Sequence, residues 1–427
     1  MESTSQPQSR WNWKWKLFIA FVVWALVVGG SHLRQRRQIE AYFEETRAQG
    51  LPTNFVELQE FYQVPEGVTD STQAWVPALK DASRAIMESR EPGSPPPFIN
   101  EEIPEIGQSW EQLSAVEKFL QKMAPQFQAI HRATEMGGQA RFPENSGHHR
   151  HVAKLLELEA AVAARRGESA RSLEAVRAIL AMANAKRGQP DMIALMSSEG
   201  IREVGISSME RWLPHCQWAD GDLASLQRLI CEVDFHKEFQ NALAGDCIMY
   251  IDGLDEEGHF PFRTVNEKEY LLQYSNARKE LALPWHEMIS RFHRLDSRIE
   301  SLKSDRLGIW TRSAFLKYAP TLEMFGQVMA NAAARQACAN VGLAAQRYRL
   351  RHGRLPTSLG EIEPDLLGKL PDGTVPLTDS FDGQPLRVHL HERHLVIYSV
   401  GMNLIDEGGV KVHSPEGYKD IGFNLPR

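Results

Sequence analysis

The sequence predicts a mainly α-helical protein with an N-terminal transmembrane helix, a helical-hairpin bundle or irregular solenoid as its body, and a small C-terminal α+β module with an antiparallel hairpin. Three patterns predict this class: an uncharged apolar run near the N-terminus, apolar residues at three- and four-residue spacing through the middle, and alternation near the C-terminus. The 427 residues are 42% apolar and 24% charged, an ordinary globular composition that suffices for two or three compact units.

The anchor is predicted over residues 11–33, after a tail at residues 1–10. Its centre is the run from Leu17 to Gly30, in which nine of fourteen residues are Leu, Ile, Phe or Val. Those nine favour insertion into a bilayer by about 3 to 5 kcal/mol. The run reaches only about 21 Å of a hydrocarbon core of about 30 Å, so flanking residues must complete the span. The flank before the run is suited to the headgroup level and consists of Trp11, Trp13, Trp15, Lys14 and Lys16.

Two questions stay open for this segment. A basic start and the small residues Gly29 and Gly30 also fit a cleaved signal peptide, although no Ala-x-Ala site follows the run. The positive-inside rule does not decide which end of the segment lies in the cytoplasm, because both flanks carry the same number of basic residues. Arg10, Lys14 and Lys16 precede the run, and Arg34, Arg36 and Arg37 follow it. A short tail before a large domain is the usual layout of a signal anchor. We therefore expect a single-pass protein of the inner membrane with its body outside the cytoplasm.

Residues 34–148 are expected to hold a juxtamembrane helix and a loop-rich connecting region. Apolar residues between Ile39 and Phe43 share one helical face, and Gly50 suits a helix end. Turn residues dominate from Val64 to Gly107, and the proline string at residues 94–98 favours extended geometry. This region is interpreted as a connection and not as a domain.

Residues 149–323 are predicted to form the helical body. Two apolar stripes joined by a tight glycine turn indicate an antiparallel helical hairpin, and further hairpins follow. The first stripe is Val152, Leu155, Leu158 and Val162, and the second is Leu173, Val176, Leu180 and Ala183. Because the 34-residue period of tetratricopeptide repeats is missing, a bundle or an irregular solenoid is expected.

Residues 324–427 are predicted to be one long helix followed by the α+β module. The helix runs from about Met324 to His352, with small residues along one stripe, and ends at Gly353. Apolar Leu, Val and Leu then alternate with polar residues over positions 386–390, a turn follows, and LVIYSV forms a second strand. The pattern indicates a β-hairpin.

The segment from about Ala344 to Gly409 resembles the C-terminal part of the major pseudopilins of type II secretion. The strings AAQRYRLRHGRLPTSL, DSFDGQPLRV and IYSVGMNLIDEGG carry this resemblance, over about a sixth of the chain. The whole chain is also similar to membrane-anchored helical proteins of planctomycete-type bacteria that have no known activity. Two departures argue against polymerisation as a pilin: Ser380 stands where pseudopilins usually have proline, and no prepilin cleavage site lies near Gly29 and Gly30.

Calcium is the cofactor that the pseudopilin resemblance implies. An acidic loop binds calcium in that family, and Asn403, Asp406 and Glu407 occupy the matching loop here, with backbone carbonyls available from the glycine turn. The alternative to a calcium site is a structural role. In that case the polar, proline and glycine residues of this region only fix the turns that close the hairpin onto the helix. These residues are Asp379, Gly383, Pro385, Ser399, Gly401 and the pair Gly408 and Gly409.

No catalytic residue is assigned from the sequence. His148, His149 and His151 cluster before a helix that carries Glu157 and Glu159, but neighbouring residues point in different directions, and surface histidines are the simpler interpretation. The sequence contains neither a GxSxG elbow nor a P-loop.

Charge and cysteine usage narrow the classes of partner. The net charge of −7 gives no indication of the positively charged surface that binds a phosphate backbone, so nucleic acid is not expected as a partner. The cysteines are predicted to be buried thiols, with a disulfide between Cys231 and Cys247 as the alternative if the body lies outside the cytoplasm. Cys216 and Cys338 complete the set.

The sequence thus favours a membrane-tethered extracytoplasmic scaffold that binds a protein partner, associated with secretion or cell-envelope assembly and without catalysis. Its partners would be the lipid bilayer, through residues 11–33, and a protein. The alternative is an exported metal-dependent hydrolase or ligand-binding protein that uses a groove in the helical body.

Overall fold

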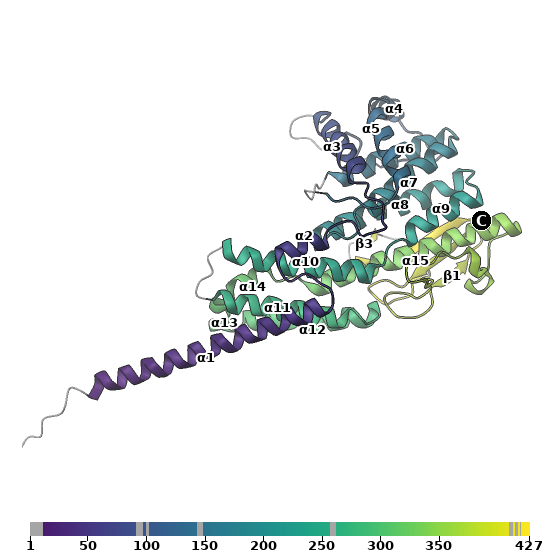
Figure 1. Cartoon of the computed structure of the whole chain (residues 1–427). Coiled ribbons are helices and arrows are strands. Elements are labelled where there is room, and N and C mark those ends of the chain that lie inside the picture. Colours follow the sequence, from purple (N-terminus) through teal and green to yellow (C-terminus); the bar gives the residue numbers. More distant parts are fainter. Residues whose placement is uncertain are drawn as a thin grey trace, which may run out of the picture.

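The chain is mainly helical, with a small antiparallel sheet near the C-terminus (Figure 1). The computed structural model describes residues 12–90, 97–99, 102–142, 148–256, 262–409, 413–414, 417–418 and 420–427. The predicted mainly α class and the β-containing C-terminal module are confirmed.

The first helix, α1 (Asn12–Ala48), leaves the body as a long rod (Figure 1). Its second half packs on α11 (Arg263–Glu280), where Ile39 and Thr46 are buried. Its first half carries exposed apolar side chains, namely Trp13, Trp15, Leu17, Phe18, Ile19, Phe21, Val22, Val23, Leu26 and Leu33. One helix therefore joins the predicted anchor to the predicted juxtamembrane segment without a break.

The transmembrane prediction for residues 11–33 finds no support in the described part of the chain. No helix there combines the length with the hydropathy needed to cross a bilayer. The predicted tail at residues 1–10, together with Trp11, lies outside the described residues.

Three helices between residues 72 and 136 pack where the sequence analysis expected a loop-rich connection. They are α3 (Thr72–Glu88), α4 (Leu113–Lys122) and α5 (Ala124–Met136), and they follow a short helix, α2 (Phe55–Phe61). Trp75, Leu79 and Phe127 are buried in a core shared with the helices that come next. The interpretation of residues 34–148 as a connection is corrected accordingly, because apolar residues at helical spacing give α3 a buried face.

The centre of the body consists of antiparallel helical neighbours. These are α6 (His149–Arg165), α7 (Ser169–Ala185), α8 (Met192–Trp212), the 3₁₀ turn η1 (Leu213–His215) and α9 (Asp220–Cys231). The turn between α6 and α7 contains Gly167 at a φ of 74°, a backbone conformation that glycine adopts without strain. The predicted hairpin of residues 149–185 is confirmed.

A second hydrophobic core lies in the part of the body beside α1. It is built by α10 (Phe235–Glu256), α11, α12 (Trp285–Lys303) and α14 (Ser313–Tyr318), and the short helix α13 (Arg306–Thr311) connects α12 to α14. Phe239, Tyr270, Phe292 and Phe315 are buried in it, and Ile39 of α1 joins them.

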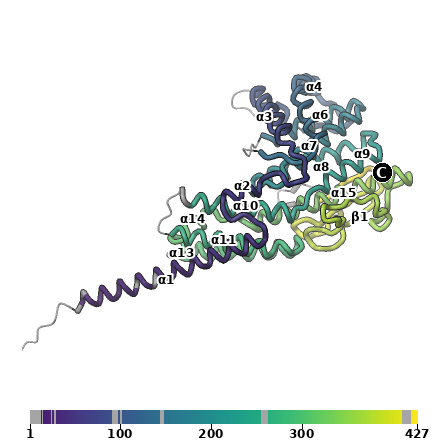
Figure 2. The backbone as a smooth tube through the Cα atoms, in the orientation of Figure 1, coloured from purple at the N-terminus to yellow at the C-terminus, as the bar shows by residue number. Residues whose placement is uncertain are grey.

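The long helix α15 (Leu322–His352) connects the two cores. Its first residues, such as Met329, pack in the second core, whereas residues from Ala337 onward pack in the first. Figure 2 shows this course from the α10–α14 group toward the C-terminal sheet. The helix ends at Gly353 with a φ of 73°, so the predicted helix and its glycine end are confirmed.

The C-terminal sheet has three strands in the order β1-β2-β5. The predicted hairpin is present as β1 (Arg387–Leu390) and β2 (His394–Ser399), with Val388 opposite Ile397. The last strand, β5 (Ile421–Pro426), pairs antiparallel with β2 and was not predicted. A two-residue ladder, β3 (His413–Ser414) with β4 (Gly417–Tyr418), and the 3₁₀ turns η2 (Leu359–Glu361) and η3 (Pro364–Leu366) complete the elements.

The sheet packs closely on α15. A Cβ atom at Gly342 would lie 2.2 Å from the ring of Phe423, so the helix approaches β5 at a distance that only glycine permits. Gly342 of the long helix therefore allows β5 to pack closely on it.

Candidate functional site

The C-terminal module is closed by the carboxylate of Asp379, which is fully buried. Its oxygens accept hydrogen bonds from the backbone N–H groups of Phe381 and Val400, both at 2.9 Å. Ser399 Oγ donates at 2.6 Å, and Arg387 Nη1 donates at 2.8 Å. One carboxylate thus joins the turn before β1 to the end of β2, and it fixes the start of the loop at residues 401–409, here called the acidic loop.

Asn403 and Glu407 close the acidic loop on itself. Asn403 Nδ2 donates a hydrogen bond to Glu407 Oε1 at 2.7 Å, and Asn403 Oδ1 accepts from the backbone N–H of Ile405 at 3.1 Å. The side-chain oxygen of Asn403 is therefore already engaged within the loop.

Asp406 faces the sheet. Its Oδ1 accepts a hydrogen bond from the Tyr398 hydroxyl at 2.8 Å and from the backbone N–H of Gly408 at 3.0 Å, while Oδ2 lies 3.7 Å from Arg387 Nε. The hydrogen bond from Tyr398 is the main reason that the pKa of Asp406 is lowered. Burial and the same carboxylate raise the pKa of Tyr398. Asp406 is thus a charged structural acceptor.

Asp420 lies beside Glu407, and the sequence analysis did not assign it. Asp420 is 5% exposed, and its Oδ2 accepts from the backbone N–H of Gly409 at 2.6 Å. Within the described residues, Asp420 Oδ1 and Glu407 Oε2 are buried without a hydrogen-bond donor. Burial first, and then the carboxylates of Glu407 and Asp406, raise the pKa of Asp420 to about 6. Asp420 is buried and Glu407 is half-buried, and a shared proton or a cation would relieve the repulsion between their neighbouring carboxylates at neutral pH.

The structure divides the predicted calcium ligands. Asn403 and Glu407 bond to each other, and Asp406 bonds to Tyr398, so among the described residues of this loop and β5 the oxygens without a donor belong to Glu407 and Asp420. Over the described residues, no three side chains of His, Cys, Asp or Glu are grouped as metal ligands. The chemistry of Glu407 and Asp420 fits a hard cation such as calcium, provided that backbone carbonyls supply the remaining oxygens.

The tip of the acidic loop is apolar and exposed. Leu404 is 61% exposed and Ile405 is 59% exposed, and Met402 is exposed beside them. Leu404 has a φ of 57°, a left-handed conformation that costs free energy for any side chain larger than glycine. The fold therefore holds two large apolar side chains in water on a strained backbone, as is typical of a surface that binds another molecule.

The histidine cluster is split between the core and the surface. His149 is buried, and its Nδ1 lies 3.2 Å from Lys186 Nζ. Lys186 Nζ also lies 4.7 Å from the centroid of the Phe142 ring. Burial and then Lys186 lower the pKa of His149 to about 3, and burial lowers the pKa of Lys186 to about 8. His148 is exposed, and its ring stands 5.7 Å from that of His151.

The two glutamates that follow the histidines bind basic side chains. Glu157 accepts from Lys154 Nζ at 2.7 Å, and Glu159 pairs with Arg171 at 3.2 Å and with His131 at 3.5 Å. The exposed His148 fits the interpretation as surface histidines, whereas the buried His149 corrects that interpretation for its position.

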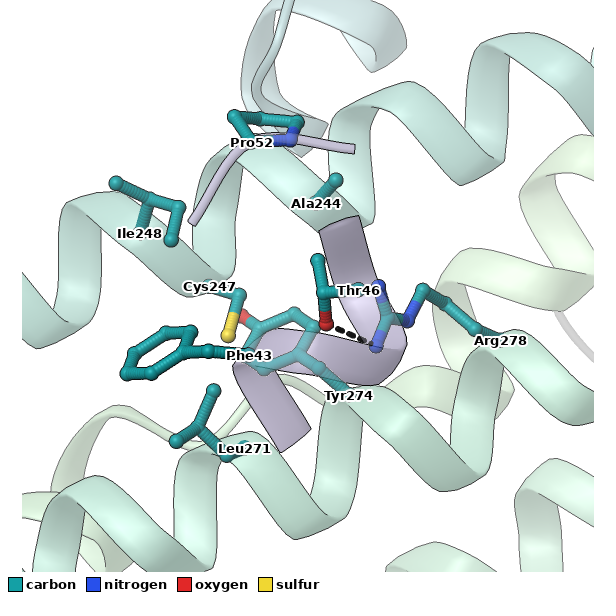
Figure 3. A pocket seen from close by; sticks show the side chains of 9 residues that line it. All are labelled: Phe43, Thr46, Pro52, Ala244, Cys247, Ile248, Leu271, Tyr274 and Arg278. Carbon is teal, nitrogen blue, oxygen red and sulfur yellow. Dashed lines mark hydrogen bonds between the residues drawn. The ribbon is translucent and has the colours of Figure 1, made fainter. Parts of the chain in front are cut away.

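The cavity shown in Figure 3 lies between α1, α10 and α11. Apolar side chains such as Phe43 and Leu271 line it, and Arg278 Nη2 donates to Thr46 Oγ1 at 2.8 Å across one side. Its volume is about 10 Å³, which is room for about one water molecule. A second hollow, of about 170 Å³, is lined by Tyr250, Tyr270, Tyr318 and apolar neighbours. Drug-sized ligands usually occupy larger cavities.

The cysteines are free thiols. Cys231, Cys247 and Cys338 are buried and Cys216 is half-buried, so the predicted buried thiols are confirmed for three of them, and the alternative disulfide is not formed. Burial raises the pKa of the Cys231 and Cys247 thiols to about 12, which keeps them protonated and unreactive.

No family model matches the chain, and no curated protein or solved structure is significantly similar to it. The resemblances to pseudopilins and to planctomycete-type proteins therefore stay predictions.

Proposed function

We propose that this protein is a membrane-anchored scaffold that binds a protein partner through the apolar tip of its acidic loop. We place the body on the outer side of the cytoplasmic membrane, in agreement with the layout of the N-terminal sequence. The observation that carries the proposal is the first half of α1, whose apolar side chains stand in water and away from the body (Figure 1).

The exposed half of α1 supports attachment to lipid. An apolar surface of this size on a folded protein is typical of a membrane or protein contact. Arg34, Arg36 and Arg37 follow the apolar run and are exposed, so they are placed to meet lipid headgroups. The second half of α1 packs on α11, and this contact would transmit the attachment to the body.

The apolar tip of the acidic loop supports the binding of a partner. Leu404 and Ile405 are exposed together, and hydrogen bonds around Asn403, Asp406 and Asp379 hold the loop that carries them. A pre-ordered loop loses little entropy on binding. We propose an apolar pocket of a second protein as its binding partner.

A photo-crosslinking residue at Met402 is expected to give a discrete protein adduct in intact membranes. Leu404→Ser with Ile405→Ser should abolish the adduct, because these substitutions remove about 2 to 3 kcal/mol of apolar burial, or about 30- to 150-fold in affinity. The matched control carries the same crosslinker at Ile193, which is 73% exposed on the first turn of α8 and should give no such adduct. The same adduct from both positions, or none from Met402, would contradict the proposal.

We further propose that calcium joins Glu407 to Asp420 and stiffens the acidic loop. The support is the pair of buried oxygens that lack donors among the described residues. Calcium would neutralise the repulsion between the two carboxylates, while backbone carbonyls of the glycine-rich turn completed the coordination.

Calcium is expected to raise the melting temperature of the full chain at pH 7.5 and to have little effect at pH 5. The folded-state pKa of Asp420, about 6, lies above its ordinary value of 3.8. Protonation of Asp420 therefore adds stability that is fully present below about pH 4 and is lost as the pH rises through about 6. Calcium needs the deprotonated form, so it restores the loss only above that pKa.

The melting scans would include Asp420→Asn and, as a control, Asp372→Asn at an exposed position of the same module. Asp420→Asn should lose the calcium response, whereas Asp372→Asn should keep it. An equal calcium response in both variants, or no response of the unmodified chain at pH 7.5, would rule out this site.

A further inference from the structure

A second apolar surface lies at the end of the body from which α1 departs. Trp310 is 66% exposed and Ile309 is 47% exposed, both on α13. The ring of Phe262 packs against that of Trp310 with centroids 4.6 Å apart. A large aromatic side chain that stands in water beside a second apolar residue is uncommon on a soluble surface.

The contact of His32 with Thr264 and the ring contact of Phe262 with Trp310 place this surface beside the exit of α1. Thr264 Oγ1 lies 3.3 Å from His32 Nε2, and Phe262 precedes Thr264 by two residues. α1 packs on α11, which begins at Arg263 and includes Thr264, and the ring contact of Phe262 leads from there to Trp310 of α13. The apolar run from Leu17 to Gly30 ends just before His32. Trp310 therefore lies close to the point on α1 where the apolar run ends and the contact with the body begins.

The chemistry of the surface suits lipid headgroups. Tryptophan prefers the boundary between hydrocarbon and water, where its ring is apolar and its N–H is hydrated. Arg306 and Arg263 are exposed in the same two segments, and guanidinium groups bind lipid phosphates.

We propose that Trp310, Ile309 and Phe262 form a second membrane contact that sits at the headgroup level and fixes the tilt of the body. This inference rests on the proposed attachment through α1. With one helix in the lipid and a second contact beside it, the body is restrained in tilt and in rotation about the axis of α1. The acidic loop then faces its partner at a constant orientation.

The test measures the depth of a probe in the full chain, reconstituted in vesicles of phosphatidylethanolamine and phosphatidylglycerol. A fluorescent thiol-reactive NBD group is placed by Trp310→Cys, with Cys216→Ser to remove the one half-buried native thiol. The control carries the probe at Ile193→Cys, a more exposed apolar position on α8. Lipids that carry a nitroxide near the headgroup should quench the probe at position 310 and leave the probe at position 193 bright.

An alkaline carbonate wash separates this inference from the proposed attachment. If the protein stays with the vesicles and the probe at position 310 is quenched no more than the one at position 193, the second contact is disproved while the attachment stands. If the protein washes off, both the attachment and the contact that rests on it are disproved.

Discussion

Replacement of Val23 and Leu26 by lysine is expected to release this protein from membranes. Both side chains lie in the centre of the apolar run, and both are more than half exposed on the part of α1 that stands away from the body. Each lysine replaces a residue that favours insertion with one that opposes it. Together they cost about 6 to 8 kcal/mol of insertion free energy. Because the body is not altered, the circular dichroism spectrum and the melting of the helical core should stay unchanged.

The matched control is Glu40→Lys on the second half of the same helix. This exposed position follows the apolar run, and its substitution changes the net charge by the same two units as the double variant. After an alkaline carbonate wash, the unmodified chain and Glu40→Lys should sediment with membranes, whereas the double lysine variant should stay in solution. Sedimentation of all three proteins would mean that the apolar half of α1 does not hold the protein in lipid.

Local patterns predicted the elements whose contacts are close in sequence. The stripes of α6 and α7 repeat at helical spacing, and the glycine at position 167 marks the turn between them, so their hairpin follows from the sequence alone. The same holds for the long helix with its end at Gly353 and for the alternation of β1 and β2. In these elements, propensity, periodicity and end signals all agree.

The missed elements depend on distant partners. Pro77 lies inside α3 and a proline-rich segment follows the helix, so the buried face that includes Trp75 and Leu79 was hidden by turn signals. The last strand, β5, contains Gly422, Asn424 and Pro426, which are poor strand formers. It becomes a strand because β2 offers it a pairing edge and α15 offers it a packing surface.

In the candidate site, too, the sequence predicted the local feature but not the contacts between distant residues. Asn403, Asp406 and Glu407 lie within one short loop, so an acidic turn was visible in the sequence. Their roles were not visible, because Asp406 depends on Tyr398 and Glu407 depends on Asp420. Asp420 reaches Glu407 only because β5 pairs with β2 and carries the end of the chain back to the loop. A distant strand pairing thus decides which carboxylates meet.

The second large effect is expected at Arg335, the cation that joins the helical body to the C-terminal sheet. Its guanidinium, on α15, is almost fully buried. It pairs with Glu210 at 3.0 Å and with Glu203 at 3.2 Å, both on α8, and donates to the backbone carbonyl of Gly422 in β5. Burial alone would lower the pKa of Arg335, but the two carboxylates outweigh it and raise the pKa. The guanidinium of Arg335 therefore stays charged at neutral pH.

Arg335→Met is expected to cost about 3 to 5 kcal/mol of stability, because it leaves the largely buried carboxylate of Glu210, whose side chain is 12% exposed, without this cation. Glu210 Oε1 also accepts from the backbone N–H of Asn424 at 2.8 Å, so the disturbance should spread along β5. Hydrogen exchange of the amides at residues 421–426 measures the opening free energy at that strand directly. Protection there should fall further than in α3, which packs away from this pair.

Two control variants separate charge burial from general damage. Glu203→Gln alters the partner whose side chain is 53% exposed, and it should cost less than about 1 kcal/mol. Arg335→Met combined with Glu210→Gln should recover part of the loss, because no unpaired charge stays buried and the amide oxygen can still accept from the backbone N–H of Asn424. If Arg335→Met cost no more than Glu203→Gln, this ion pair would not be what joins the sheet to the body. Because the sheet positions the acidic loop, a loss at Arg335 should also weaken the crosslink from Met402, although Arg335 lies on α15 and not in the loop.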